Sequence, residues 1–405
     1  MNITSNLIIF LTAFCLTFFN LNNEKELIAF KENVNAEEKI STVKISAVGD
    51  LMCHSVQFKY ANVEGDSFNF NNVYGIVKKY ISSADFSFAN FETVTAGKDK
   101  GYSGYPFFNS PDDFVTALSS AGFDLLTTSN NHSLDRGEFG VRRTIEIIKQ
   151  NKINYNGTFL NEKDRDSVRI FDIGGIKIAM LAYSYGTNGI PVPAGEKYLI
   201  NLIDFKLIKN DILVSKRIGA EIVLVHYHFG DEYKREPVQY QKDVVDKTLQ
   251  AGADIIIGGH PHVVQPSIFF KTNGAKLDTG FAAYSLGNFV SNQRRRYSDA
   301  GVILNLYISK NFTTDSIYLS KVTFIPTYVF KGITDRGKEY IILPSELAYA
   351  DSIPEYLTQS DILAMKQSFE DTREIMTMYN SKIKVESVLT RLSYYSTFKE
   401  NVKPK

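Results

Sequence analysis

Cysteine is scarce, tryptophan is absent and neither sign of charge is in excess in this sequence of 405 residues. With only two cysteines, Cys15 and Cys53, a disulfide scaffold is excluded, and so is a zinc site built mainly from thiolates. The 45 Lys and Arg residues equal the 45 Asp and Glu residues, so the chain lacks the basic excess typical of nucleic-acid-binding proteins. A metal site would therefore need histidine, asparagine and carboxylate ligands.

The N-terminal apolar run is shorter than the roughly twenty residues that a membrane-spanning helix needs. This run, Leu7–Phe19, suits the central region of a signal peptide. No Lys or Arg precedes it and no clear Ala-x-Ala cleavage site follows it, which favours retention over cleavage. We expect residues 1–24 to be a signal or membrane anchor and residues 25–42 to be a linker. The main domain would then be extracytoplasmic and held at the cell membrane, or secreted if the segment is cleaved.

Strand-like and helix-like patterns alternate over residues 43–342, which predicts an α/β domain. A helix is expected over residues 111–122, because a proline and two acids stand at its start and a glycine at its end. Gly174-Gly175 separates two β-rich runs and predicts a hairpin. Residues 343–405 turn polar and helical, so we expect a C-terminal helical appendage there.

Polar clusters follow the carboxyl ends of the predicted strands. In open α/β sheets ligands bind outside these ends, so clusters that are distant in sequence converge in space. A single histidine at such a turn is usually a hydrogen-bonded core residue, but every histidine of this chain adjoins Asp, Asn or Glu at a strand end. Imidazole and carboxylate groups together suit ions such as Mn, Fe or Zn. The six histidines are His54, His132, His226, His228, His260 and His262.

Three of these clusters supply carboxylate and amide groups as well. Asp50 ends the first predicted strand, and Glu92 follows another strand and could bridge two cations. In Asn131-His132 an amide oxygen adjoins an imidazole, with Asp135 close by. This arrangement suits one residue as a metal ligand and the next as an acid or a transition-state stabiliser.

Two pairs of histidines are spaced by a single residue, which places both side chains on the same side of an extended segment. One pair is His260 and His262, and the other is His226 and His228. Because the spacing is the same, geometry alone does not choose the ligand within the second pair.

The motifs around these residues resemble the metallo-dependent phosphatase superfamily, and most closely its CapA branch of poly-γ-glutamate capsule proteins. The resemblance covers about residues 43–290 and implies a metallophosphoesterase-like fold of layered sheets flanked by helices, an α/β/β/α sandwich. The matching stretches are Gly49–Met52, Ala89–Glu92, Asn130–Gly137, His228–Tyr233, Gly252–Asp254, Gly259–Gln265 and Ser285–Phe289.

The resemblance also implies two divalent metal ions, of Mn, Fe or Zn, and a role for each matching residue. His132 would act on the leaving group, with Asp135 beside it, and the context of His228 favours it over His226 as a ligand. Met52 stands where the superfamily has a histidine, and His54 is the nearest substitute. The implied ligands are Asp50 and His262 for one ion, Asn131, His228 and His260 for the other, and Glu92 as the bridge.

A run of three arginines, Arg294, Arg295 and Arg296, could bind phosphate or carboxylate groups, although a solvated loop explains it equally well. The resemblance favours an exported, membrane-anchored protein that assists synthesis or export of poly-γ-glutamate or a related capsule polymer, in a membrane complex. Two alternatives stay open: an exported phosphoesterase with a small phosphorylated substrate, and a non-catalytic assembly partner.

Overall fold

The structure is a computed structural model that describes residues 39–272 and 276–389. The predicted anchor over residues 1–24 and most of the predicted linker over residues 25–42 lie outside this part. Within the described part, every helix is too short or too polar to cross a lipid bilayer.

The chain divides into two compact units. Of the described residues, the larger unit comprises residues 41–272, 276–310 and 316–389, and the smaller unit comprises residues 39–40 and 311–315. The helices, the candidate site and the strands described below belong to the larger unit, except for Ile40 and Asn311, which lie at the ends of two strands.

The larger sheet has nine strands within the described residues, in the order β16-β15-β14-β1-β4-β5-β6, with β13 beside β1 and β17 beside β15. Strands β1, β4, β5 and β6 run parallel, so their carboxyl ends lie at the same edge of the sheet. The strands are β1 (Ile40–Leu51), β4 (Phe86–Phe91), β5 (Leu125–Thr127), β6 (Asn154–Asn156), β13 (Asn288–Val290), β14 (Ala300–Asn311), β15 (Ser316–Thr334), β16 (Gly337–Pro344) and β17 (Lys384–Val385).

The smaller sheet has the order β11-β12-β10-β9-β8-β7. Its central strands are parallel, and the predicted hairpin at Gly174-Gly175 is confirmed, since β7 and β8 pair antiparallel and both glycines have positive φ angles. The strands are β7 (Arg169–Ile173), β8 (Ile176–Ser184), β9 (Ile222–His228), β10 (Ile255–Gly259), β11 (Ser267–Lys271) and β12 (Thr279–Ala283); β2 (Asn62–Glu64) and β3 (Ser67–Phe68) form a separate ribbon.

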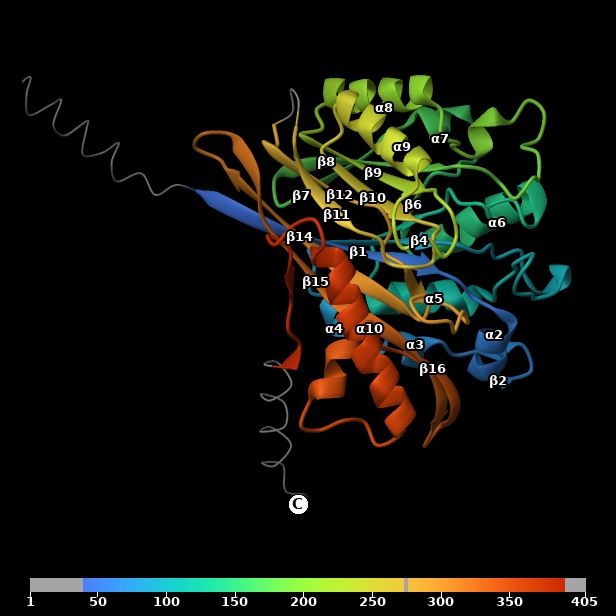
Figure 1. The fold of residues 1–405 in the computed structure, drawn as a ribbon. Coiled ribbons are helices and arrows are strands. Elements are labelled where there is room, and N and C mark those ends of the chain that lie inside the picture. Colours follow the sequence, from blue (N-terminus) through green and yellow to red (C-terminus); the bar gives the residue numbers. More distant parts are fainter. Residues whose placement is uncertain (1–38, 273–275, 390–405) are drawn as a thin grey trace, which may run out of the picture. The chain divides into compact units, whose positions relative to one another are not determined.

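Helices cover the outer faces of both sheets. Figure 1 shows α8 and α9 over the smaller sheet and α3, α5 and α10 on the side of the larger sheet. The predicted layering of two sheets between helices is therefore confirmed. The helices are α2 (Ser55–Ala61), α3 (Asn71–Tyr74), α4 (Lys78–Ile81), α5 (Asp112–Ala121), α6 (Gly137–Gln150), α7 (Glu162–Asp166), α8 (Phe205–Arg217), α9 (Gln239–Gln250) and α10 (Gln359–Thr377).

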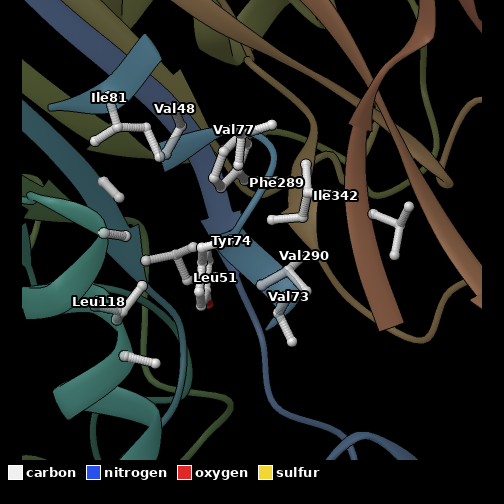
Figure 2. Packing of buried hydrophobic residues seen from close by; sticks show 14 of the residues in the cluster. Val48, Leu51, Val73, Tyr74, Val77, Ile81, Leu118, Phe289, Val290 and Ile342 are labelled. Carbon is white, nitrogen blue, oxygen red and sulfur yellow. The ribbon is translucent and has the colours of Figure 1, made fainter. Parts of the chain in front are cut away.

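Each interface between layers has its own apolar core. The core between the sheets joins residues such as Ile45 of β1 and Leu224 of β9. The core outside the larger sheet joins Val48 of β1 to Tyr74 and Leu118 of the covering helices (Figure 2). Because successive side chains of a strand point to opposite faces, β1 contributes to both cores.

The predicted helix over residues 111–122 is α5, and its ends have the expected chemistry. Asp112 and Asp113 stand in its first turn, where the helix dipole favours negative charge. Gly122 ends the helix in the left-handed conformation, with φ of 99°. These residues set the two ends of α5, and the next strand, β5, begins soon after Gly122.

Residues 344–389 are packed as part of the domain rather than as an appendage, and the rest of the predicted appendage, residues 390–405, lies outside the described residues. Strand β17 pairs with β15 of the larger sheet. Ile375 and Met376 of α10, together with Ile383, are buried in the core between the sheets. The sequence did not predict this packing, because α10 is polar on its exposed side and its buried apolar residues are dispersed along the helix.

Candidate metal centre

The carboxyl ends of strands from both sheets meet at the candidate site. The larger sheet contributes Asp50 at the end of β1, Glu92 just after β4, and Asn131 with His132 in the turn after β5. The smaller sheet contributes His228 at the end of β9, and His260 and His262 at and after the end of β10. All seven side chains are buried, so the predicted clusters converge.

The backbone around Asp50 is shaped to bring its carboxylate into the site. The pairing of β1 with β4 shifts register between Val48 and Asp50, and such a bulge re-aims the side chain that follows it. A Cβ atom on Gly49 would lie 1.9 Å from the carbonyl oxygen of Gly287, and one on Gly259 would lie 2.5 Å from Asp50 Oδ1. Both positions therefore require glycine.

Hydrogen bonds hold the Asp50 carboxylate from several sides. Asn90 Nδ2 donates to Oδ1 at 2.8 Å, the amide of His260 donates to Oδ2 at 3.1 Å, and His262 Nδ1 lies 3.2 Å from Oδ2. Burial opposes ionisation, but the hydrogen bond with His262 and the charges of His228 and His262 hold the pKa of Asp50 well below its usual range. Asp50 is therefore a charged, fixed acceptor.

Glu92 is buried without any hydrogen-bond donor among the described residues. Neither carboxylate oxygen has a partner, although His228 Nε2 lies 3.4 Å and His262 Nε2 lies 3.7 Å from Oε1. Burial raises the pKa of Glu92 to about 8. Because an unsatisfied buried carboxylate is costly, this residue needs either a proton or a bound cation.

His228 lies between two asparagines. Its Nε2 is 2.8 Å from Asn131 Oδ1, and its Nδ1 is 3.0 Å from Asn90 Nδ2. Burial lowers the pKa of His228 to about 3, and burial also holds the pKa of His260 well below its ordinary value. Both rings are therefore neutral near neutral pH, which is the state that binds a metal ion.

His262 is oriented by Asn288 as well as by Asp50. Its Nδ1 is 3.1 Å from Asn288 Oδ1, which leaves Nε2 facing Glu92. An oriented Nδ1–H with a free Nε2 is the usual arrangement of a histidine ligand and its supporting residue. Burial disfavours the charged ring, but the carboxylates of Glu92 and Asp50 raise the pKa of His262 to about 9.

Three groups of donor atoms occur among the described residues. Two of them share Glu92, one with Asp50 and His262 and one with His228 and His260, and the third joins the exposed Glu232 to His260 and His262. Within each group the donor atoms lie within 4.8 Å of one another. Two ligand atoms at about 2.1 Å from one ion lie about 3 Å apart when they subtend a right angle. The distance of 2.8 Å between His228 Nε2 and Asn131 Oδ1 matches this separation. The arrangement fits a pair of bridged cations.

His132 and Asp135 form a second buried pair at the site. His132 Nδ1 lies 2.8 Å from Asp135 Oδ2, which also accepts a hydrogen bond from the Phe108 amide at 2.7 Å. The Phe108 ring meets the His132 ring edge-on, with 4.7 Å between centroids. These contacts fix the ring and leave Nε2 available for proton transfer to a ligand.

His54 and His226 lie near the site but belong to none of the three groups of donor atoms found within the described residues. His54 caps α2 and contacts Gln57 and the amide of Asn292. His226 is buried on β9, and its Nδ1 has no hydrogen-bond partner among the residues that the structure describes. Burial lowers the pKa of His54 to about 4 and that of His226 to about 3, so both rings are neutral.

The three arginines of the predicted basic run have different surroundings. Arg294 donates to the Tyr328 hydroxyl and to the Val329 carbonyl, and Arg296 forms a two-pronged ion pair with Asp371. Arg295 is exposed and makes no ion pair with any described residue, and its guanidinium lies over the ring of Tyr233. The sequence alone could not separate them, because Asp371 is distant in the chain.

Two exposed residues on the loop after β8 reach the site and were not predicted. The Tyr185 ring lies 4.6 Å from the His260 ring, and Asn188 accepts a hydrogen bond from Asn131 at 3.1 Å. Asn188 Nδ2 also lies 3.5 Å from His132 Nδ1. No periodic pattern marks this loop, so only the fold reveals these contacts.

Several site residues have the left-handed backbone conformation that favours glycine. The φ angles are 97° at His260, 56° at His262, 63° at Tyr233 and 50° at Asn188. Such backbone strain concentrates at functional sites, where the surrounding structure holds it in place.

Residues 44–293 match the family described as "Bacterial capsule synthesis protein PGA_cap". The chain belongs to this family. It is 27% identical over 276 residues to "Capsule biosynthesis protein CapA" of Bacillus anthracis, an alignment that covers 66% of this chain and 64% of that protein. It is also 27% identical over 281 residues to "PGA biosynthesis protein CapA" of Bacillus subtilis (strain 168), covering 66% of this chain and 68% of that one. The chain thus spans just under two thirds of the length of the Bacillus anthracis relative.

Solved structures with some similarity include the calcineurin-like phosphoesterase YfkN from Bacillus subtilis, at a TM-score of 0.42 and 14% identity, covering 82% of this chain and 98% of that one. A putative 5'-nucleotidase from Staphylococcus aureus has a TM-score of 0.44 and 15% identity, covering 82% of this chain and 58% of that one. Similarity at this level says nothing about the chemistry of this member of the capsule synthesis family.

Proposed function

We propose that this chain is a cell-envelope protein that assists synthesis or export of poly-γ-glutamate or a related anionic polymer through a metal-dependent hydrolytic site. Family membership supports the link to capsules. The observation that supports the metal site is Glu92. Its two buried oxygens have no hydrogen-bond donor among the described residues, and its Oε1 lies 3.4 Å from His228 Nε2 and 3.7 Å from His262 Nε2. A charge in this position is stable when cations lie on either side of it.

The residues suit a pair of Mn, Fe or Zn ions, because the donors combine imidazoles, carboxylates and one amide. Asp50 and His262 would hold one ion, Asn131, His228 and His260 the other, and Glu92 would bridge them. When bound, such a pair supplies charge stabilisation and a water of lowered pKa.

The protein's own residues supply orientation and proton transfer. Asn288 and Asp50 fix the His262 ring, and Asn90 holds the Asp50 carboxylate. Asp135 and the edge contact with Phe108 fix His132, so that its Nε2 can donate a proton to a leaving group. The reaction class is hydrolysis of a phosphate ester or of a glutamyl amide.

Residues 1–24 would anchor the protein in the cell membrane, where it would work with the polymer synthesis and export complex. The apolar run Leu7–Phe19 supports this proposal. Membrane fractionation of the full chain and of a chain starting at residue 25 tests it. Recovery of both forms in the soluble fraction would exclude anchoring by this segment.

Metal content and thermal stability test the site directly. Glu92→Gln should lower the bound metal of the purified full chain and abolish the rise in Tm on adding Mn. Asp254→Asn is the matched control, because Asp254 is also a buried carboxylate but lies at the start of β10, where it accepts from the Val223 amide at 2.9 Å. Normal metal content in Glu92→Gln would refute the bridging role.

Turnover separates the proposal from its alternatives. Phosphate esters and γ-glutamyl amides are offered to the Mn-, Fe- and Zn-loaded chain, with His132→Gln expected to be slower by a factor of about 10²–10⁴. Activity on small phosphate esters alone would favour an exported phosphoesterase. A capsule phenotype unchanged by His132→Gln, with no turnover, would favour a non-catalytic assembly partner.

A further inference from the structure

Three arginines and two tyrosines stack beside the candidate metal centre, and we call them the arginine–tyrosine strip: Arg235, Arg295, Arg296, Tyr233 and Tyr297. The guanidinium of Arg295 lies 5.9 Å from the centre of the Tyr233 ring. Those of Arg235 and Arg296 lie 4.1 Å and 4.7 Å from the centre of the Tyr297 ring. Such stacking holds guanidinium groups in place while their edges stay available for hydrogen bonds.

The strip begins at the metal centre. The ring centroids of Tyr233 and His262 are 6.2 Å apart, and the Tyr233 amide donates to the carbonyl of Pro261 at 2.8 Å. A ligand group held by Arg295 would therefore lie next to the residues that are proposed to bind metal.

A cavity of about 160 Å³ lies at the other end of the strip. Arg235, Arg296 and Tyr297 line it together with Asp299 and residues of α10. Whole small-molecule sites usually measure about 300–1,000 Å³, so this cavity suits one acidic group and its nearest atoms rather than an entire ligand.

Two of the arginines have N–H donors that are available for a ligand. Arg295 is exposed and forms no ion pair within the described part of the chain. Arg235 donates to the main-chain oxygen of Asp371 at 2.8 Å, but its buried Nε has no hydrogen-bond acceptor in the part of the chain that the structure describes. A buried donor without an acceptor is costly, and a bound anion would satisfy it.

The charges around the strip favour a singly charged group. Arg296 is paired with the Asp371 carboxylate at 2.8 Å, Asp299 lines the cavity, and Glu232 stands beside Tyr233. These three acids formally balance the three guanidinium groups, so the strip carries little net charge. A carboxylate is therefore better matched than a doubly charged phosphate.

The backbone adds a second and independent sign of function. Both tyrosines of the strip have left-handed conformations, with φ of 63° at Tyr233 and 76° at Tyr297. For a bulky residue this conformation is uncommon and costs energy, and it persists where the structure holds a side chain in a required position.

We propose that the arginine–tyrosine strip is a subsite that binds a carboxylate-bearing unit of the polymer chain while the neighbouring unit lies at the metal centre. Arg295 contacts one carboxylate at the mouth of the site, and Arg235 contacts a carboxylate in the cavity. This assignment rests on the proposed function, since it gives that site its substrate orientation.

The test measures binding of a fluorescent γ-linked glutamate oligomer to the Mn-loaded full chain. Arg295→Gln and Arg235→Gln should each weaken binding about tenfold, as expected for loss of one charge-assisted hydrogen bond. Arg373→Gln is the matched control, because Arg373 is an exposed arginine of α10 that pairs with Glu370 on the same helix. All three variants should retain the metal content of the unmodified chain.

The outcomes separate this assignment from the proposed function. Normal metal content with unchanged oligomer binding in Arg295→Gln and Arg235→Gln would overturn the subsite and leave the metal site standing. Oligomer binding that depends on Arg295 in a chain that takes up no Mn, Fe or Zn when these ions are offered would support the subsite and refute the metal site. Equal binding of a γ-linked oligomer whose α-carboxylates are replaced by neutral carboxamides would also overturn the subsite. So would displacement by inorganic phosphate at a lower concentration than by γ-glutamylglutamate.

Discussion

Asp50 and Glu92 end adjacent parallel strands and are both buried, but their surroundings differ. Asp50 is held by Asn90, by the His260 amide and by His262. Glu92 has no hydrogen-bond donor among the described residues. The pKa is consequently shifted down at one acid and raised to about 8 at the other.

This difference indicates which part of the site is satisfied by the chain's own hydrogen bonds and which part needs a bound ligand. The Asp50 end of the site is completed by the chain's own hydrogen bonds, so it belongs to the folded structure. The Glu92 end is left open, so the protein pays in stability for a position that only a proton or a cation completes. Mutations at the two acids should therefore act in opposite directions on the metal-free protein.

Asp50→Ala should give the largest effect. It removes the acceptor for Asn90 and the His260 amide and leaves the His262 ring without its carboxylate partner, which should lower the free energy of unfolding by about 3–5 kcal/mol. Urea unfolding of the metal-free chain measures this. A loss below about 1 kcal/mol would contradict the view that Asp50 is part of the framework.

Glu92→Gln should stabilise the metal-free chain by roughly 1–3 kcal/mol, because it replaces a buried, unsatisfied acid by a neutral group. It should also remove the stabilisation that metal gives to the unmodified protein, which is about 2.7 kcal/mol at a free metal concentration of a hundred times Kd. The same urea experiment with and without Mn compares the two. Destabilisation of the metal-free variant would show that Glu92 has partners of its own.

The pH dependence of the metal-free chain should show the same asymmetry. The pKa of Glu92 is raised from 4.5 to about 8 and that of His262 from 6.5 to about 9. At a pH between these two values of a group, the unfolded chain binds fewer protons at that group than the folded chain does. Stability should then fall as pH rises from about 6.5 to 8, by roughly 1 kcal/mol per pH unit for each group.

Below pH 6.5 the sign is reversed by other histidines. The pKa values of His226 and His228 are lowered to about 3, so the unfolded chain binds more protons there and stability rises with pH. The metal-free chain should therefore be most stable near pH 6. Denaturant midpoints across the pH range check this, and a steady rise in stability to pH 9 would contradict it.

Asn188→Gly should have the smallest effect. It removes the acceptor for Asn131 at 3.1 Å, while glycine accepts the φ of 50° without strain. Metal affinity should fall by roughly 1 kcal/mol, equivalent to several-fold in Kd. Lys152→Gly is the matched control, because Lys152 is exposed and has φ of 59° but lies after α6. Equal metal affinity in both variants would exclude Asn188 from the site.

Local patterns predicted much of the fold. The acids after Pro111 and the glycine at 122 indicated the ends of α5, and Gly174-Gly175 indicated the β7–β8 hairpin, because these signals depend on a few neighbouring residues. The convergence of Asp50, Glu92 and the histidine pairs was predictable too, since strand ends of a parallel sheet share an edge.

Contacts between distant segments were not predictable in this way. Tyr185 and Asn188 reach the site from a loop without periodicity, and the pairing of Arg296 with Asp371 depends on where α10 docks. The docking of the segment after residue 343 was not predicted for the same reason, because the short strand β17 is recognisable only from its pairing with β15. The roles of the individual site residues stay predictions that the mutants above test.

The position of β1 in its sheet bears on how the chain is made. In the larger sheet this strand lies between β4 and β14. Strand β4 follows β1 closely in the sequence, whereas β14 comes only after most of the domain. In a growing polypeptide, one side of β1 therefore lacks its neighbouring strands until β13 and β14, residues 288–290 and 300–311, have left the ribosome. Completion of the larger sheet is therefore a late event in the synthesis of the chain.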